Sequence, residues 1–160
     1  MIRAATTADA EAIAAIYNWY IENSHHTFEE DVLSVQDMAL RIETVGPLSP
    51  WFVMEQDGGI VGYTYAAAWK PRAAYRFTRE TSVYLHREYF AQGRGRRLYQ
   101  HLIDELSNTP IHVLIAGIAL PNEGSIALHE SLGFNKIGQF HEVGFKYENY
   151  VDVGYWQLTL

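Results

Sequence analysis

The chain has 160 residues, of which 48% are hydrophobic and 14% aromatic, far from the composition of disordered proteins. This length fits one domain with a substantial core, so we predict a single domain over residues 1–160. The lack of cysteine excludes disulfides, thiolate catalysis and cysteine-ligated metals. The first residues lack the apolar stretch of a signal peptide, and no run approaches the ~20 apolar residues of a membrane span. We therefore expect a cytoplasmic protein that does not bind membranes.

The net charge of −7 hides an uneven distribution of charge along the chain. Residues 70–97 contain eight of the 12 basic residues and only two acidic ones, whereas the other 132 residues carry four basic and 17 acidic side chains. Such a segment suits a solvated face, a nucleic-acid footprint or a site for a small anion. Because the acidic remainder repels a polyanion, we favour a small anion and expect no nucleic-acid partner. The eight basic residues are Lys70, Arg72, Arg76, Arg79, Arg87, Arg94, Arg96 and Arg97.

The first quarter of the chain predicts a short strand over residues 2–4 and two helices. Thr6 or Thr7 can cap the first helix, whose apolar residues between positions 13 and 21 recur at helical spacing. Ser34 and Asp37 resemble a capping arrangement for the second helix, which carries an apolar face and ends at Gly46–Pro47. That apolar face consists of Met38, Ile42 and Val45.

A meander of strands follows, over residues 51–55, 60–65 and 81–85. Asp57–Gly58 is a favoured turn pair between the first two of these strands. A helix then begins at Gly93-Arg94-Gly95, and a nearly continuous apolar run over residues 111–118 predicts a strand that is buried on both faces.

The chain is expected to close with a short helix over residues 122–132 and strands over 134–140 and 151–160. Gly133 stands where a left-handed helix cap belongs. The element order predicts a mixed α/β fold with one central sheet and about four helices.

The step from a strand through Gly93-Arg94-Gly95 into a helix is the first functional signal. Glycines let backbone N–H groups approach an anion, and a helix N-terminus carries about half a positive elementary charge. Three arginines in the first turn, at positions 94, 96 and 97, also favour an anion there. The alternative is an ordinary tight turn. The Walker pattern G-x-x-x-x-G-K-[ST] is absent from the sequence. A dinucleotide-binding fingerprint is also excluded, because Leu98 occupies the position of its third glycine.

The second signal is the segment from Leu120 to Phe134, which reads LPNEGSIALHESLGF. Its pattern N-x-x-[S/A]-x-x-L-[Y/H]-x-x-L-G-F, together with G-x-G some 29 residues upstream, resembles the Gcn5-related N-acetyltransferases (GNAT). The resemblance extends over nearly the whole chain to the phosphinothricin or methionine-sulfoximine N-acetyltransferase branch. The residues that carry it are Trp69 to Arg72, Tyr75, Glu80 to Tyr84, Leu98 to Leu102, Leu120 to Asn122, His129-Glu130 and Asp152 to Trp156.

The resemblance implies a single mixed sheet splayed in the middle, with acetyl-CoA in the opening and its pyrophosphate at the G-x-G turn. Where the family motif begins with Arg or Gln, this chain has Phe90, which cannot donate a hydrogen bond; Gln92, Arg94 or Arg96 can compensate. A backbone N–H around Val83 to Leu85 would polarise the thioester carbonyl. The residues expected to bind acetyl-CoA are Val83, Tyr84, Leu85, Gln92, Gly93, Arg94, Gly95, Arg96, Asn122 and Ser125.

Two residues match positions to which the family assigns catalysis. Glu80 is expected to act as the general base for the amine, directly or through water, and such assistance typically contributes ~10²- to 10⁴-fold. His129 is expected to be a base partner or the acid that protonates the CoA thiolate. The structural alternatives are an ion pair of Glu80 with Arg76 or Arg79, and a histidine that only satisfies its neighbours.

The resemblance also implies a substrate pocket lined by basic and aromatic residues, which suit a carboxylate or phosphinate. It implies a homodimer, in which Val153 and its neighbours come from the partner subunit. No H-E-x-x-H or comparable spacing is present, so we expect no metal. The expected substrate-binding residues are Phe28, Lys70, Arg72, Tyr75, Tyr84 and Val153, with Arg76 either among them or facing solvent.

Three functional hypotheses follow. The leading one is acetyl-CoA-dependent N-acetylation of a small amino-acid-like substrate, such as phosphinothricin, methionine sulfoximine or methionine sulfone. The second keeps the fold and cofactor but acetylates a polyamine, an aminoglycoside or a protein N-terminus, and cationic substrates would require carboxylates where Lys70 and Arg72 stand. The third is a noncatalytic acyl-CoA-binding module.

Overall fold

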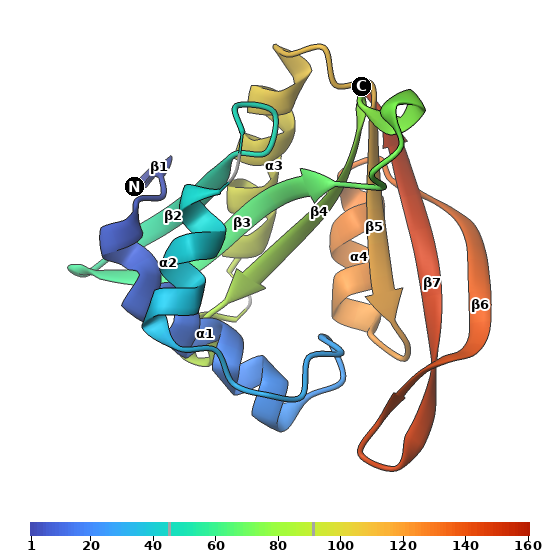
Figure 1. The fold of residues 1–160 in the computed structure, drawn as a ribbon, viewed down its shortest axis with the longest axis horizontal. Coiled ribbons are helices and arrows are strands. Elements are labelled where there is room, and N and C mark those ends of the chain that lie inside the picture. Colours follow the sequence, from blue (N-terminus) through green and yellow to red (C-terminus); the bar gives the residue numbers. More distant parts are fainter. Residues whose placement is uncertain (45, 91) are drawn as a thin grey trace.

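A computed structural model describes residues 1–44, 46–90 and 92–160 and shows seven strands in one sheet, with helices on both faces (Figure 1). The strand order is β1-β2-β3-β4-β5-β7-β6. All neighbouring strands are antiparallel except β4 and β5, which are parallel. Val45, expected on the apolar face of the second helix, lies outside the described residues.

The order of elements confirms the predicted mixed α/β fold. The strands are β1 (Ile2–Ala4), β2 (Trp51–Gln56), β3 (Gly59–Ala68), β4 (Thr78–Leu85), β5 (Val113–Ala119), β6 (Asn135–Lys146) and β7 (Asn149–Thr159). The helices are α1 (Ala10–Asn23), α2 (Val35–Glu43), α3 (Arg94–Ser107) and α4 (Glu123–Ser131). Three short 3-10 turns are η1 (Thr7–Asp9), η2 (Ala73–Tyr75) and η3 (Arg87–Tyr89).

Local signals set most helix ends, with two differences from the prediction. The capping box at α2 is confirmed, because Ser34 Oγ accepts a hydrogen bond from Asp37 N at 3.1 Å. The helix nevertheless ends at Glu43, before Gly46. At the N-terminus, Thr6 N donates to the Asp9 carboxylate at 2.8 Å and starts the 3-10 turn η1, so α1 itself begins only at Ala10.

Of the two hairpins, one has the predicted turn and the other is longer than predicted. Asp57 and Gly58 adopt φ values of 53° and 81° and form the predicted two-residue turn between β2 and β3. The β6–β7 hairpin is longer than predicted, since its strands extend to Lys146 and from Asn149. Its turn residues, Tyr147 and Glu148, have φ values of 51° and 58°, which residues other than glycine rarely adopt. Because neither residue is glycine, the sequence gives no ordinary turn signal at these two positions.

Two apolar clusters fix the helices on opposite faces of the sheet. On one face, α1 and α2 pack against β2 and β3 through residues that include Ile13, Tyr17 and Tyr63. On the other face, α3 packs through Leu98 and Leu102 against the sheet. Each fully buried large apolar side chain contributes roughly 1.5–3 kcal/mol, so both faces anchor the sheet firmly.

The centre of the sheet is splayed, as predicted. The strands β4 and β5 pair only from Thr78↔Val113 to Glu80↔Ile115, and beyond this point they diverge (Figure 1). The remaining five residues of β4 and four residues of β5 therefore border a wedge-shaped split. Within the described residues, no helix has the length and apolar character needed to cross a membrane.

Candidate active site

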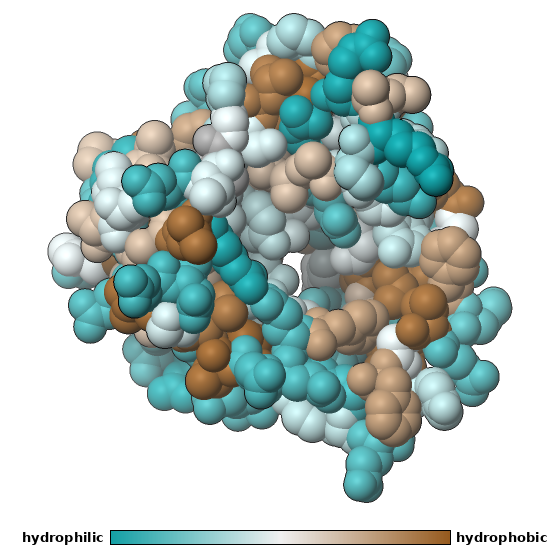
Figure 2. All heavy atoms as spheres, viewed as in Figure 1, coloured by the Kyte–Doolittle hydropathy of each residue, from teal (hydrophilic) through white to brown (hydrophobic). Residues whose placement is uncertain are grey.

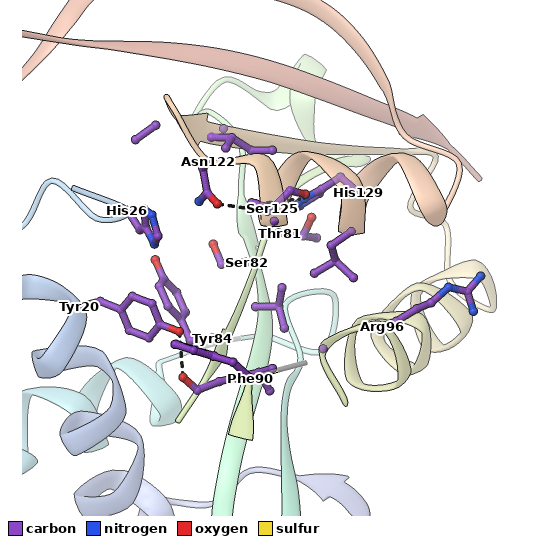
Figure 3. Close-up of a pocket in the computed structure, with 18 of the residues that line it drawn as sticks. Tyr20, His26, Thr81, Ser82, Tyr84, Phe90, Arg96, Asn122, Ser125 and His129 are labelled. Carbon is purple, nitrogen blue, oxygen red and sulfur yellow. Dashed lines mark hydrogen bonds between the residues drawn. The ribbon is translucent and has the colours of Figure 1, made fainter. Parts of the chain in front are cut away.

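A cavity of about 520 Å³ occupies the split between β4 and β5. Figure 2 shows an opening at this place that passes through the molecule, and Figure 3 shows polar side chains that converge on it from β4, α1, the segment after α1, and α4. The lining residues are Tyr20, His26, Thr81, Ser82, Val83, Tyr84, Leu85, Phe90, Gly93, Gly95, Arg96, Gly117, Ile118, Ala119, Asn122, Gly124, Ser125, Leu128 and His129.

The two strands that border the split direct backbone groups into it. His86 N donates to Val61 O at 2.9 Å. Because the direction of hydrogen bonding alternates along a strand, the amides and carbonyls of Val83 and Leu85 point away from β3, into the split. The bond from Leu120 N to Asp152 O, 2.9 Å long, likewise leaves the backbone groups of Gly117 and Ala119 facing the split from β5.

These two backbone edges suit an extended ligand that contains amides, because such a ligand can add to a free strand edge. One acceptor is already used, since the Tyr20 hydroxyl donates to Leu85 O at 2.8 Å. A backbone N–H around Val83 to Leu85 is expected to polarise the thioester carbonyl, and the amides of Val83 and Leu85 belong to this stretch.

The N-terminus of α3 opens onto the same cavity. Gly93 has a φ of 72° as the N-cap residue, and Arg97 N donates to Gly93 O at 3.0 Å. The amides of Arg94, Gly95 and Arg96 precede this first helical bond and therefore lack an acceptor within the helix. A Cβ at Gly95 would lie 3.4 Å from the Leu85 side chain, which shows that α3 begins directly against β4. These amides form a potential anion site.

Side chains around this turn divide into two groups. Arg96 lines the cavity and donates to Ser131 O at 3.3 Å. Arg94 instead donates from Nε to Gln56 Oε1 at 2.9 Å and lies over the Tyr89 ring, outside the lining residues. Gln92, with a φ of 59°, is also outside the lining. Phe90 contributes an apolar wall beside Tyr20. Of the three residues expected to compensate for Phe90, only Arg96 therefore lies at the cavity.

The start of α4 supplies the opposite wall (Figure 3). Asn122 caps the helix, because its Oδ1 accepts from Ser125 N at 3.1 Å, and this leaves its amide NH₂ free to donate. His129 is 4% exposed and packs edge-on against the rings of both Tyr99 and Phe134. Its Nδ1 lies 2.7 Å from Ser125 O. A carbonyl can only accept, so Nδ1 carries the proton and Nε2 is the acceptor atom of the neutral ring.

The electrostatics of His129 follow from its burial. Burial lowers the pKa of His129 below its usual 6.5, and the Ser125 carbonyl opposes this effect. At neutral pH the imidazole is therefore uncharged and able to accept a proton at Nε2.

Glu80 lies at the vertex of the split, as the last residue that pairs β4 with β5. A Cβ at Gly117 would lie 3.6 Å from Glu80 Oε1. Burial raises the pKa of Glu80 above its usual 4.5. Among the described residues neither Arg76 nor Arg79 pairs with it: Arg79 donates to the carbonyls of Leu48, Arg76 and Thr78. The carboxylate therefore keeps its proton-accepting capacity.

The residues expected to bind substrate are less concentrated. Tyr84 alone among them lines the cavity. Lys70, Arg72 and Tyr75 lie on the exposed connection between β3 and β4. Phe28 rests against Gly144 of β6, and Val153 is buried in β7 opposite Ala119.

The basic segment forms two separate groups in space. Lys70, Arg72 and Arg76 precede β4, whereas Arg94, Arg96 and Arg97 follow it. The eight residues of β4 span ~26 Å at about 3.3 Å per residue. The basic residues of this segment therefore lie in two groups, one at each end of the strand.

Several lining residues were not anticipated from the sequence. Tyr20 and His26 reach the cavity from α1 and the segment after it, and Thr81 and Ser82 belong to β4 itself. Gly117 interrupts an apolar run, and this interruption is a signal that could have marked it. No group of three His, Asp or Glu side chains suited to a metal occurs among residues 1–44, 46–90 and 92–160.

Known proteins are similar to this chain over nearly its whole length. A family model described as acetyltransferase (GNAT) domain matches residues 2–154. The phosphinothricin N-acetyltransferase of Streptomyces viridochromogenes is 37% identical over 98% of this chain and 85% of its own length. The L-methionine sulfoximine/L-methionine sulfone acetyltransferase of Salmonella typhimurium is 35% identical over 99% of this chain and 94% of its own.

A solved structure agrees in fold. The acetyltransferase yncA from Salmonella typhimurium, solved with its cofactor acetyl-CoA, has a TM-score of 0.97 and 35% identity, and the match covers 100% of this chain and 93% of the other. The chain therefore belongs to the GNAT acetyltransferase family and is an N-acetyltransferase. Within that family, relatives at 35–37% identity over nearly the full chain are phosphinothricin and methionine sulfoximine/sulfone N-acetyltransferases.

Proposed function

We propose that this chain transfers the acetyl group of acetyl-CoA to the α-amine of a small amino-acid-like substrate, of the phosphinothricin, methionine sulfoximine or methionine sulfone type. The observation that carries this proposal is the split itself, which presents two backbone edges, a helix N-terminus and, at its vertex, a half-buried carboxylate without a cationic partner among the described residues.

The residues of the split fit acetyl-CoA. The free amides at the start of α3 suit a pyrophosphate, and Arg96, whose guanidinium donates to Ser131 O, adds positive charge beside them. The edges of Val83, Leu85, Gly117 and Ala119 suit the amides of a pantetheine arm. When bound, acetyl-CoA supplies an activated thioester acyl group, and CoA thiol is released.

Glu80 is proposed as the group that accepts the proton of the substrate amine. Its raised pKa makes it a stronger base than an ordinary carboxylate. His129 is proposed to act beside it, and its uncharged ring favours a base or water-holding role over that of an acid. The amides of Val83 and Leu85 are proposed to polarise the carbonyl that is attacked.

The carboxylate of the substrate is proposed to meet Lys70, Arg72 and the neighbouring Tyr75. A line of contacts supports this direction, because the Lys70 ammonium lies over the Trp69 ring and Trp69 packs edge-on against Tyr155. Tyr155 in turn lies beside Gly117, close to Glu80. The basic residues therefore approach the vertex of the split from the face that α1 and α2 cover.

We also propose that the active form is a homodimer. The edge strand β6 and its hairpin turn expose large apolar side chains, which Figure 2 shows over the β6–β7 hairpin. Monomers rarely leave such surfaces uncovered. Sedimentation velocity measures the mass directly, and a monomer at micromolar concentration contradicts this part of the proposal. The exposed residues are Ile137, Phe140, Val143, Phe145, Tyr147 and Tyr150.

The function is tested by thiol release from acetyl-CoA against a panel of amines. We expect turnover with phosphinothricin, methionine sulfoximine or methionine sulfone, and little with spermidine, an aminoglycoside or an N-terminal peptide. Turnover confined to the last three would move the substrate to another class. Acetyl-CoA binding without turnover toward any amine would indicate a noncatalytic module.

A further inference from the structure

The segment between α1 and α2 closes one end of the cavity. In Figure 1 it leaves the end of α1 and extends toward β5 and the lower part of the β6–β7 hairpin. His26 from this segment lines the cavity. His25 Nε2 lies 3.3 Å from Pro121 O, just ahead of α4, so the segment reaches from one border of the split to the other. The position of residues 24–28 therefore sets the shape of the cavity on the side opposite α3.

Lys146, the last residue of β6, holds this segment by its backbone. It is 2% exposed, and its Nζ donates to Ile21 O, Ser24 O and Thr27 O at 2.8, 2.8 and 2.9 Å. A lysine ammonium has three donors, and all three are used. Ile21 belongs to the last turn of α1, whose carbonyls lack partners within the helix and carry partial negative charge.

No carboxylate forms a salt bridge with Lys146 among the residues that the structure describes. A buried ammonium without such a partner is costly to maintain unless its hydrogen bonds are satisfied. The three carbonyls belong to the end of α1 and to two residues of the segment that follows it, so they satisfy the ammonium only when α1 and residues 24–27 keep this one arrangement. The geometry therefore restricts the segment more than one surface hydrogen bond would.

A second contact from β6 supports the same segment. The ring of Phe28 lies so close to Gly144 that a Cβ there would be 2.3 Å from its Cζ atom. The Tyr147 hydroxyl donates to Ile21 O at 2.7 Å, beside the bond from Lys146. The end of β6 thus contacts the segment on both sides of His26.

We infer that Lys146 is a positioning residue of the acetyltransferase: it fixes residues 24–28 and thereby holds His26 in the cavity and Phe28 against Gly144, on the side of the cavity opposite the α3 N-terminus. This inference rests on the proposed function for its kinetic consequence. Its structural part, the restraint of residues 24–28, stands independently of which amine is acetylated.

The test compares Lys146→Met with the matched control Lys136→Met. Methionine keeps most of the apolar volume and removes the three donors, whereas Lys136 lies exposed on the same strand, donates to Gln139 and has its ammonium over the Trp156 ring. We expect kcat/KM for the amine to fall roughly 10- to 100-fold in Lys146→Met, mainly through KM, because displacement by about 1 Å costs this much. The Kd for acetyl-CoA, measured by calorimetry, should stay within about twofold, and Lys136→Met should match wild type in both.

Hydrogen–deuterium exchange supplies the readout that does not depend on turnover. Amides of residues 24–28 should exchange faster in Lys146→Met, while those of α3 remain as in wild type. Unchanged exchange at residues 24–28, or equal losses for the amine and for acetyl-CoA, would overturn the inference. If wild type acetylates no amine while this exchange pattern is found, the proposed function fails and the restraint by Lys146 stands.

Gly144→Ala provides a second variant in case Lys146→Met does not fold. It keeps every hydrogen bond of Lys146 and displaces only the Phe28 ring. We expect a raised KM for the amine with unchanged acetyl-CoA affinity. An unchanged KM for the amine in Gly144→Ala would show that the segment does not shape the substrate side, and would overturn the inference.

Discussion

Glu80 and Gly117 face each other where β4 and β5 separate, and a Cβ on Gly117 would lie 3.6 Å from Glu80 Oε1. The same Cβ would lie 3.2 Å from Cε1 of Tyr155. Position 117, which lines the cavity, therefore lies at contact distance from the Glu80 carboxylate, and a side chain there would crowd the Tyr155 ring first.

Replacement of Glu80 by Gln should lower kcat by roughly 10²- to 10⁴-fold, because the amide cannot accept a proton from the amine. Acetyl-CoA affinity should change little, since the α3 N-terminus and the strand edges are untouched. Steady-state kinetics and calorimetry measure the two quantities. Unaltered turnover would remove Glu80 from the mechanism.

The same variant should be more stable than wild type at pH 8. Burial raises the folded-state pKa of Glu80 above 4.5, so ionisation costs the native state stability. The contribution of Glu80 to the free energy of unfolding is greatest at pH values below its pKa in the unfolded state. This contribution is lost as the pH rises through its pKa in the folded state. Urea unfolding should therefore show a gain for Glu80→Gln at pH 8 that disappears near pH 3, and a gain of equal size at both pH values would contradict the cause.

The pH profile of turnover should have its acidic limb below pH 7. Burial lowers the pKa of His129 below 6.5, so this ring reaches its proton-accepting form before neutrality, and burial raises the pKa of Glu80 above 4.5. As pH falls through these pKa values, protonation should reduce kcat. Measurement at saturating substrates from pH 5 to pH 8 tests this, and a limb centred above pH 7 would assign the limiting ionisation elsewhere.

His129→Phe separates chemistry from packing at this position. Phenylalanine keeps the ring contacts with Tyr99 and Phe134 but removes Nε2 and the bond from Nδ1 to Ser125 O. If His129 assists proton transfer, kcat should fall at least about tenfold, while stability changes by only about 1 kcal/mol. A loss of stability with full turnover would make the histidine structural.

Gly93→Ala should destabilise the protein by about 1 kcal/mol, because an alanine at a φ of 72° is strained although nothing crowds its Cβ. Gly124→Ala is the matched control, since its Cβ also meets open space and its backbone lies in α4. Alanine there should stabilise by up to about 1 kcal/mol. Urea titration measures both, and similar effects at the two positions would argue against backbone strain.

Arg72→Ala should raise KM for an acidic amino-acid substrate about tenfold or more, because loss of a charge-assisted hydrogen bond costs roughly 1.5–3 kcal/mol. The KM for acetyl-CoA should remain near the wild-type value. Arg87→Ala, on the exposed turn η3, is the control for loss of one positive charge. Equal effects of Arg72→Ala on both substrates would place the amine pocket elsewhere.

Patterns with a strong local cause were predictable from the sequence. The capping box of Ser34, the hairpin at Asp57–Gly58, the start of α3 at Gly93 and the left-handed Gly133 each follow from short-range geometry, and all are present. Glu80 and His129 were identified by a family resemblance, and the structure brings Glu80 to the vertex of the split and His129 to its wall.

Features that depend on contacts far apart in the sequence were not predictable. The left-handed turn at Tyr147–Glu148 has no glycine, and its place depends on contacts such as that of Tyr147 with Ile21, 126 residues away. His26 enters the cavity because β6 holds its segment.

The short parallel junction between β4 and β5 links the two halves of the sheet through only three registered pairs. The angle at which the strands leave this junction determines how quickly the split widens with distance from it. Glu80 is the last residue of the junction on β4. A substitution that alters packing beneath Thr78 to Glu80 would therefore change both the width of the opening and the direction of the carboxylate. The range of acyl-chain lengths that the enzyme accepts and its catalytic rate should then change together.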